Sequence, residues 1–173
     1  MELKNSIREV MDFPKEGISF KDITPLLKDK GQFQYIIKEL AGQLKALNIE
    51  VVVGPEARGF LVGAPVAYEL GIGFVPVRKP GKLPAETVKH EYQLEYGADA
   101  LEIHRDGIQP GQRVAIVDDL LATGGTVLAA AKLIEALGGE VVSMNFLIEL
   151  SFLNGRQSLS KYHIESLVQY DQE

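Results

Sequence analysis

The stretch that decides the fold is Val114-Ala115-Ile116-Val117-Asp118-Asp119-Leu120-Leu121-Ala122-Thr123-Gly124-Gly125-Thr126. It begins with a mostly β-branched apolar run, Val114 to Val117, which is typical of a strand covered on both faces. Two adjacent carboxylates follow, and then a loop of small residues that opens a helix. In open α/β sheets, ligands bind in the crevice at the carboxyl ends of the strands. The stretch therefore predicts a ligand site at the end of a buried parallel strand.

The loop after this strand predicts a phosphate site. It consists of the small residues Ala122, Thr123, Gly124, Gly125 and Thr126. Because side chains take up so little room, the backbone N–H groups can converge on an anion, helped by two threonine hydroxyls and the positive end of the following helix. Neither the P-loop pattern Gly-x-x-x-x-Gly-Lys-Ser/Thr nor a Gly-x-Gly-x-x-Gly after the first strand occurs in the sequence, so the commoner nucleotide folds are not supported.

The two carboxylates complement the phosphate loop. Asp118 and Asp119 would repel a phosphate, but they suit sugar hydroxyls or a hydrated metal beside it. A ligand that carries a phosphate close to two neighbouring hydroxyls is a ribose 5-phosphate. Neighbouring side chains of an extended strand point to opposite faces, so we expect the chain to have begun to turn at this pair if both are to reach one ligand. The alternative is a pair of solvated charges at a strand end.

Composition limits the class of protein. The 173 residues suit one domain, 46% are hydrophobic and 24% charged, and there is no cysteine for disulfides or thiolate metal sites. No apolar run approaches the roughly 20 residues that span a bilayer, and the first residues lack the apolar centre of a signal peptide. We therefore expect a cytoplasmic protein. The net charge of −6 argues against nucleic acid and membrane surfaces as partners.

An acidic protein that binds a polyphosphate must concentrate its cations locally. The segment from 78 to 89 does so, with only Glu86 opposing the basic residues Arg78, Lys79, Lys82 and Lys89. A solvated loop with a chance cluster is the alternative. From Arg78 to about Leu101 the chain has no clear period, and we predict a long excursion that forms a flap, which two strands could build.

Periodicity predicts an α/β fold. Apolar residues recur at helical steps over 31–47, and further helices are expected over 60–70, where Pro65 could kink the helix or mark a later start, and over 125–137, before Gly138-Gly139. Short apolar runs predict strands at 50–54, 73–77, 113–117, 141–148 and 164–168. Alternating strands and helices imply parallel pairing with right-handed crossovers. We expect one domain, 1–173, with a mostly parallel twisted sheet of about five strands and helices on both faces.

The stretch quoted first resembles the phosphoribosyl-diphosphate (PRPP) loop of type I phosphoribosyltransferases. The segment from Phe13 to Asp29 resembles the N-terminal hood of the adenine-specific members, and the run Leu94-Glu95-Tyr96-Gly97 resembles their catalytic flap. The similarity extends from about Phe13 to Tyr170. It implies the type I phosphoribosyltransferase fold, with residues 1–30 as a hood over the base and residues 78–101 as a long flexible flap.

The resemblance also assigns residues to pyrophosphate and to the purine proton. The run Gly54 to Phe60 is similar to the family's pyrophosphate loop, which implies pyrophosphate contacts at Ala57 and Arg58 and a non-proline cis peptide near Glu56–Ala57. Many relatives have Ser where this chain has Ala57, so backbone amides are expected to compensate. In the flap, the resemblance implies that Arg78 and Lys82, with Lys79 as a weaker candidate, engage pyrophosphate. It also implies that Glu95 manages a purine proton and that Tyr96 closes the site.

In the hood, the resemblance implies that Phe20 stacks on adenine while the backbone at Ser19 and Lys21 reads the edge that carries the exocyclic amine. Relatives often have Arg where this chain has Lys21, which lacks the planar fork. Because the backbone does the reading, adenine specificity is expected to survive. Phe20 as an ordinary core aromatic is the alternative.

The implied activity is transfer of the 5-phosphoribosyl group from PRPP to adenine, with Mg²⁺ as cofactor and adenine and PRPP as partners. The catalytic residues would be Glu95, Asp118 and Asp119, with Mg²⁺ bound mainly through PRPP and water. A homodimer is implied, with the base of the flap near the interface. Three alternatives remain: transfer to hypoxanthine, guanine or xanthine; a PRPP-sensing regulator that binds nucleic acid; and a nucleotide-binding module without catalysis.

Overall fold

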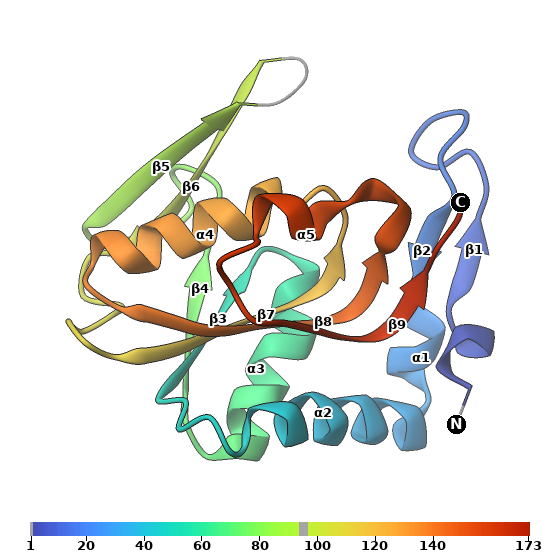
Figure 1. The fold of residues 1–173 in the computed structure, drawn as a ribbon, viewed down its shortest axis with the longest axis horizontal. Helices are drawn as coiled ribbons and strands as arrows, with labels where there is room; N and C mark the ends of the chain where they lie inside the picture. Colours follow the sequence, from blue (N-terminus) through green and yellow to red (C-terminus); the bar gives the residue numbers. More distant parts are fainter. Residues whose placement is uncertain (1, 94–96) are drawn as a thin grey trace.

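The computed structural model describes residues 2–93 and 97–173. A parallel five-stranded sheet with the order β4-β3-β7-β8-β9 forms its centre (Figure 1). Its strands are β3 (Val51–Pro55), β4 (Gly73–Val77), β7 (Arg113–Leu121), β8 (Glu140–Leu150) and β9 (Ile164–Tyr170). The predicted α/β fold with about five parallel strands is confirmed.

Alternate residues of the central strand pack into two separate cores. In β7, Val114 and Ile116 belong to one cluster of buried apolar residues, and Ala115 and Val117 belong to the other. All four are fully buried. This arrangement explains the continuous apolar run, since a strand covered on both faces needs apolar side chains at every position.

Helices supply the covering layers. On one face lie α2 (Lys30–Leu44) and α3 (Arg58–Leu70), and on the other lies α4 (Gly125–Ala136) (Figure 1). The Asp29 side chain caps α2 by accepting a hydrogen bond of 2.9 Å from the backbone of Gln32. After α4 the chain turns at Gly138, whose φ is +87°, a left-handed conformation that favours glycine.

Several sequence-based boundaries were wrong, and α2, for example, ends at Leu44 and not at residue 47. The third helix begins at Arg58 and includes Pro65, so Pro65 does not mark a later start. More important for the site, β7 does not end at Val117 but continues to Leu121, because it keeps pairing with β8, Asp118 opposite Phe146 and Leu120 opposite Ile148. The chain has therefore not turned at Asp118 and Asp119, and the loop of small residues begins only after Leu121.

Two antiparallel hairpins project from the sheet (Figure 1). Near the N-terminus, a short 3₁₀ helix, η1 (Leu3–Ser6), precedes β1 (Arg8–Val10), β2 (Phe20–Asp22) and α1 (Thr24–Lys28). The second hairpin pairs β5 (Thr87–Gln93) with β6 (Ala98–His104), which confirms the two-stranded flap. The turn between β8 and β9 holds η2 (Ser151–Leu153) and α5 (Gly155–Ser158).

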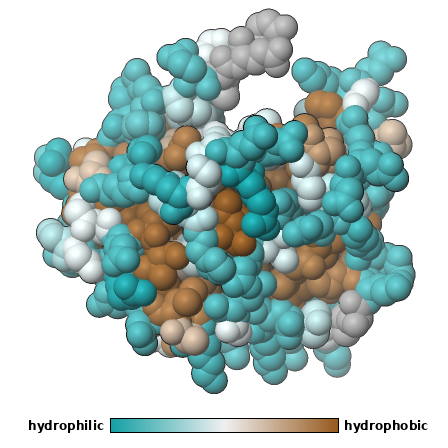
Figure 2. All heavy atoms as spheres, in the orientation of Figure 1, coloured by the Kyte–Doolittle hydropathy of each residue, from teal (hydrophilic) through white to brown (hydrophobic). Residues whose placement is uncertain are grey.

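The surface is mixed. Figure 2 shows a largely hydrophilic face on which apolar residues are exposed in separate patches. Large exposed apolar side chains include those of Leu61 and Tyr68 on α3. In the part of the chain that the structure describes, no helix combines the length and the apolar character that crossing a membrane requires.

Candidate functional site

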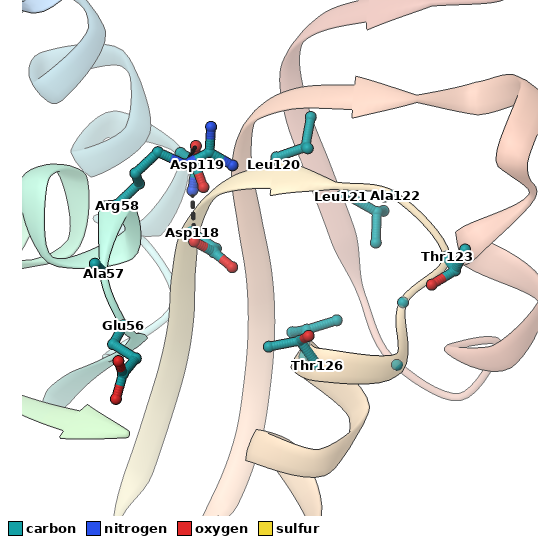
Figure 3. A pocket seen from close by; sticks show the side chains of 13 residues that line it. Glu56, Ala57, Arg58, Asp118, Asp119, Leu120, Leu121, Ala122, Thr123 and Thr126 are labelled. Atoms are coloured by element: carbon teal, nitrogen blue, oxygen red, sulfur yellow. Dashed lines mark hydrogen bonds and ion pairs between the residues drawn. The ribbon is translucent and has the colours of Figure 1, made fainter. Parts of the chain in front are cut away.

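A cavity of about 240 Å³ opens at the carboxyl ends of β3 and β7 (Figure 3). It is lined by two segments that lie far apart in sequence, Glu56 to Arg58 and Asp118 to Val127. The fold thus brings together the predicted pyrophosphate segment, the acid pair and the predicted phosphate loop. Parallel strands produce this convergence, since their carboxyl ends share one edge of the sheet.

The floor of the cavity includes the start of α4. Gly124 precedes the helix with a φ of +90°, and no hydrogen bond from a described side chain caps the helix start. The first bond within the helix runs from the N–H of Leu128 to the carbonyl of Gly124 at 3.0 Å. The N–H groups of Gly125, Thr126 and Val127 therefore have no partner inside the helix, the arrangement that receives anions at helix starts.

Asp118 and Asp119 both line this cavity although they sit in an extended strand. Asp119 is buried, and one of its carboxylate oxygens lies 3.0 Å from Nε of Arg58. Asp118 is half-buried, and its Oδ1 accepts a 2.8 Å hydrogen bond from the backbone N–H of Asp119. A Cβ atom on Gly59 would lie 2.8 Å from that same Oδ1, so glycine is what lets α3 approach the acid pair.

The acid pair is electrostatically unusual. Burial is the main cause that raises the pKa of Asp118 well above its ordinary value, and the neighbouring charge of Asp119 raises it further. Burial also raises the pKa of Asp119, although the Arg58 guanidinium acts in the opposite direction. Perturbed carboxyls that share a cavity are characteristic of functional sites.

The segment Glu56 to Arg58 connects this pair to the flap. The Glu56–Ala57 peptide is cis, at the position that the family resemblance implies. Oε1 of Glu56 accepts a 2.6 Å hydrogen bond from the backbone of Lys79 and lies 3.3 Å from Nε of Arg78. Sequence analysis gave Glu56 no role, and only its place inside the Gly54-to-Phe60 run could have signalled it.

The hood reaches the same site through Phe20. Its ring lies 4.8 Å from the guanidinium carbon of Arg58 and packs edge-on against Phe13, with the ring centroids 5.1 Å apart. Phe20 is half-buried and belongs to neither buried apolar cluster of the described residues, which argues against the core-aromatic alternative.

The side chain of Lys21 is turned into the hood. Its ammonium donates to Oγ of Ser19 at 3.0 Å, pairs with Glu9 at 3.1 Å and lies 4.6 Å from the ring of Tyr170. With those partners, Lys21 and Ser19 are both buried. The Lys21 side chain is therefore occupied inside the hood, and only the backbone of Lys21 is left to contact a ligand. This agrees with the predicted recognition of the base by backbone groups.

The basic residues of the flap differ in their surroundings. Lys79 forms an ion pair with Asp99, a contact that raises the pKa of Lys79 and lowers that of Asp99. Lys82 is exposed and forms no ion pair with the described residues. Tyr92 of β5 lies near the start of α4, since a Cβ atom on Gly125 would be 3.9 Å from its ring. Glu95 and Tyr96 lie outside the described residues.

A parallel sheet, an uncapped helix start and an acid pair in one cavity define a phosphate-binding α/β protein, and comparison with known proteins identifies the class. Residues 26–164 match the family model of the phosphoribosyl transferase domain. An adenine phosphoribosyltransferase from Alkaliphilus oremlandii (strain OhILAs) is 70% identical over 99% of both chains. The chain belongs to the adenine phosphoribosyltransferases of this family.

Solved structures agree with this assignment. The adenine phosphoribosyltransferase from Thermoanaerobacter pseudethanolicus ATCC 33223 superposes with a TM-score of 0.96 at 62% identity, covering 98% of both chains. The Saccharomyces cerevisiae enzyme, crystallised with adenine and an imino-altritol bisphosphate, has a TM-score of 0.91 at 43% identity, covering 95% of this chain and 96% of that one. The fold of this chain is therefore the type I phosphoribosyltransferase fold.

Proposed function

We propose that this protein transfers the 5-phosphoribosyl group of PRPP to adenine, giving AMP and pyrophosphate. The observation that carries the proposal is the cavity at the ends of β3 and β7, where an uncapped helix start and two carboxylates lie within one site. Relatives that match this chain over almost its full length are adenine phosphoribosyltransferases, which favours adenine over hypoxanthine, guanine and xanthine.

The ribose 5-phosphate half of PRPP occupies the cavity floor. Its phosphate accepts hydrogen bonds from the backbone of Ala122 to Thr126 and from the hydroxyls of Thr123 and Thr126. The carboxylates of Asp118 and Asp119 hold the two ribose hydroxyls. Because neighbouring side chains of a strand diverge, the two carboxylates approach the sugar from different sides.

The leaving pyrophosphate lies between the cis-peptide segment and the flap. The backbone amides around Ala57 and the cations of Arg58, Arg78 and Lys82 neutralise it. In the structure, Arg58 is paired with Asp119 and Arg78 with Glu56, so each guanidinium already lies beside a carboxylate of the site. Pyrophosphate binding has to compete with these two ion pairs.

Adenine binds beneath the hood, formed by residues 1–30 of the single domain 1–173. Phe20 stacks on the base, and the backbone of Ser19 and Lys21 reads its edge. The flap, residues 78–101, closes over the substrates and excludes water from the reactive sugar. Tyr96 takes part in that closure.

The chemical step is a displacement at C1 of the ribose. The adenine N9 attacks from the face opposite to pyrophosphate, the bond from C1 to the diphosphate oxygen breaks, and the configuration at C1 inverts. Glu95 manages the purine proton released in the reaction. The negative field of Asp118 and Asp119 stabilises the cationic sugar, and most of the acceleration comes from positioning and charge stabilisation.

Mg²⁺ fits this site as a companion of PRPP. The described residues contain no group of three or more His, Cys, Asp or Glu side chains that could hold a metal alone. Asp118 and Asp119 offer hard carboxylate oxygens, and substrate oxygens and water complete a set that Mg²⁺ prefers. When bound, the ion supplies positive charge to the diphosphate.

We also propose that the protein is a cytoplasmic homodimer. As the resemblance implies, the base of the flap lies near the interface between the two subunits. Gel filtration with light scattering is expected to give twice the mass of one chain, and a monomer at assay concentration would reject the dimer.

The reaction is tested by product identification. In separate reactions the protein is mixed with PRPP and one base, which is adenine, hypoxanthine, guanine or xanthine. Each reaction is run with and without Mg²⁺, and the products are separated by chromatography. AMP and pyrophosphate are expected from adenine with Mg²⁺. Preferential formation of another nucleotide would assign a different base, and the absence of any nucleotide would reject the proposed function.

A further inference from the structure

The proposed phosphate loop is supported from behind by α5. We use the name loop brace for Glu149 at the end of β8 together with Gly155, Arg156 and Ser158 of α5. Figure 1 shows α5 next to the start of α4. None of the α5 residues is among the described residues that line the cavity, whereas Ala122, Thr123 and Gly124 of the loop all line it.

The contact between α5 and the loop is made by backbone. A Cβ atom on Gly155 would overlap the carbonyl oxygen of Ala122 and lie 3.1 Å from Cδ1 of Leu121. From the other side, a Cβ atom on Gly124 would lie 2.9 Å from the carbonyl oxygen of Gly155 and 2.7 Å from Oγ of Ser158. Neither segment has room for even one methyl group, so the position of α5 fixes the position of the loop.

This contact also orients the loop peptides. The carbonyl of Ala122 faces Gly155, and the carbonyl of Thr123 lies 3.4 Å from the Ser158 hydroxyl, whose single proton is shared with the closer Gly155 carbonyl at 3.0 Å. In a trans peptide the C=O and the next N–H point in opposite directions. The N–H groups of Thr123 and Gly124 therefore point away from α5, and both residues line the cavity. A rotation of these peptides would present carbonyl oxygens to a phosphate and repel it.

Arg156 anchors α5 to the sheet. Its Nε and Nη2 donate to the two carboxylate oxygens of Glu149 at 2.6 and 2.7 Å, and its Nη1 donates to the carbonyl of Ile164 at 3.1 Å. Glu149 is buried and accepts a further 2.7 Å hydrogen bond from Ser166 of β9. A bidentate pair on a buried carboxylate is rigid, and it sets the angle at which α5 meets the loop.

We infer that the loop brace is a positioning device for the 5-phosphate, acting through the backbone of Ala122 to Gly124 without touching the ligand. The inference rests on the proposed function, because it assumes that this loop binds the phosphate. A residue of this kind changes phosphate affinity selectively, whereas a residue of general structural importance changes the affinity of every ligand and the stability together.

The test compares AMP with adenosine, which lacks the phosphate, by calorimetric titration. The wild-type protein is expected to bind AMP more tightly than adenosine. Gly155→Ala is expected to weaken AMP binding about tenfold or more, since a small misplacement of binding groups has large effects, and to leave adenosine binding unchanged. In kinetic assays the KM for PRPP rises while the KM for adenine stays the same.

Arg156→Lys tests the brace without adding bulk, because Lys keeps the charge but loses the fork. This substitution is expected to lower the ratio of the AMP affinity to the adenosine affinity, by a smaller factor than Gly155→Ala. If Gly155→Ala does not fold, Arg156→Lys alone tests the loop brace. Gly42→Ala is the matched glycine control, since apart from its chain neighbours and the backbone of its own helix no described atom lies within 4 Å of the added methyl. Arg113→Lys is the matched arginine control. Arg113 contacts Glu140 and Leu47 at the amino ends of the strands, far along the sheet from the cavity at their carboxyl ends.

Each outcome is decisive. A folded Gly155→Ala or Arg156→Lys protein with the wild-type ratio of AMP to adenosine affinity would overturn the brace while leaving the proposed function intact. An equal loss for AMP and adenosine would also overturn it, since that is the signature of a general structural defect. A wild-type protein that binds adenosine as tightly as AMP would reject the phosphate site itself, and the brace with it.

Discussion

The guanidinium carbon of Arg58 lies 4.8 Å from the centroid of the Phe20 ring, and Nε of the same arginine lies 3.0 Å from Asp119. One side chain therefore links the proposed base platform in the hood to the proposed ribose carboxylates at the end of β7. A guanidinium can do both at once because its positive charge is spread over a plane, so that an aromatic ring and a carboxylate can both lie close to it.

Replacing Arg58 by Lys should separate these two contacts. The ammonium keeps the charge near Asp119 but cannot stack on Phe20, so we expect kcat/KM to fall by about tenfold or more, with KM rising for both adenine and PRPP. Steady-state kinetics with each substrate varied in turn checks this. Arg105→Lys, which affects an exposed ion pair with Glu86, is the matched control and should behave like the wild type. An Arg58→Lys protein with only one KM changed would contradict the proposed link.

Asp118→Asn should abolish most activity without loss of stability. Losing the carboxylate removes its field at the sugar, and we expect turnover to fall by about 100-fold or more. The pKa of Asp118 is raised in the fold, so the charged carboxylate opposes folding at neutral pH, and the neutral amide should leave the Tm at pH 7 unchanged or higher.

Activity assays and thermal unfolding of the same Asp118→Asn preparation test this pair of effects. Asp106→Asn, at an exposed position, should change neither quantity. Wild-type turnover of Asp118→Asn would remove this residue from the mechanism. A large drop in Tm would show that the charged carboxylate stabilises the fold, contrary to its surroundings.

Phe20→Leu should weaken adenine binding selectively. Stacking of a base on an aromatic ring contributes about 1–3 kcal/mol, so the KM for adenine should rise by about tenfold or more while the KM for PRPP serves as the internal control. Initial rates at saturating PRPP give the first value, and rates at saturating adenine give the second. Equal changes in both would indicate that Phe20 holds the hood in place and does not stack on the base.

Glu149 should make stability depend on pH in the acid range. Hydrogen bonds from Arg156 are the main cause that lowers its pKa below the ordinary value of 4.5. A carboxyl with a lowered pKa stabilises the fold above its unfolded pKa, and that contribution disappears as the pH falls through the folded pKa. Thermal unfolding of wild type and Glu149→Gln from about pH 6 down to about pH 3 tests this. The difference in Tm between the two proteins should shrink at low pH, and a constant difference would rule the effect out.

Much of the architecture could be read from the sequence because its signals are local. Buried parallel strands such as β3 and β7 need continuous apolar runs, and α2 shows its buried face as a repeat of apolar residues. The sequence also allowed the prediction that the two segments lining the cavity lie close together. Each follows a buried strand, and the carboxyl ends of parallel strands meet at one edge of the sheet.

The features that sequence analysis missed depend on distant partners. The extension of β7 past Asp118 follows from its pairing with β8, the contacts of Glu56 depend on how the flap begins, and Lys21 is buried because Glu9 and Tyr170 surround it. Nothing near Gly155 in the sequence indicates that its backbone touches Ala122. Such pairings across long stretches of chain leave no periodic trace.

The ammonium of Lys21 against the ring of Tyr170 joins the hood to β9, the last strand of the sheet along the sequence. The strand β9 thus helps to support the hood, which is proposed to cover adenine. Removing the Tyr170 ring, or attaching a bulky group beside it, would therefore disturb purine recognition as well as the end of β9. A fluorescent label is better attached at Lys45, an exposed position directly after α2 that belongs neither to the hood nor to the cavity lining.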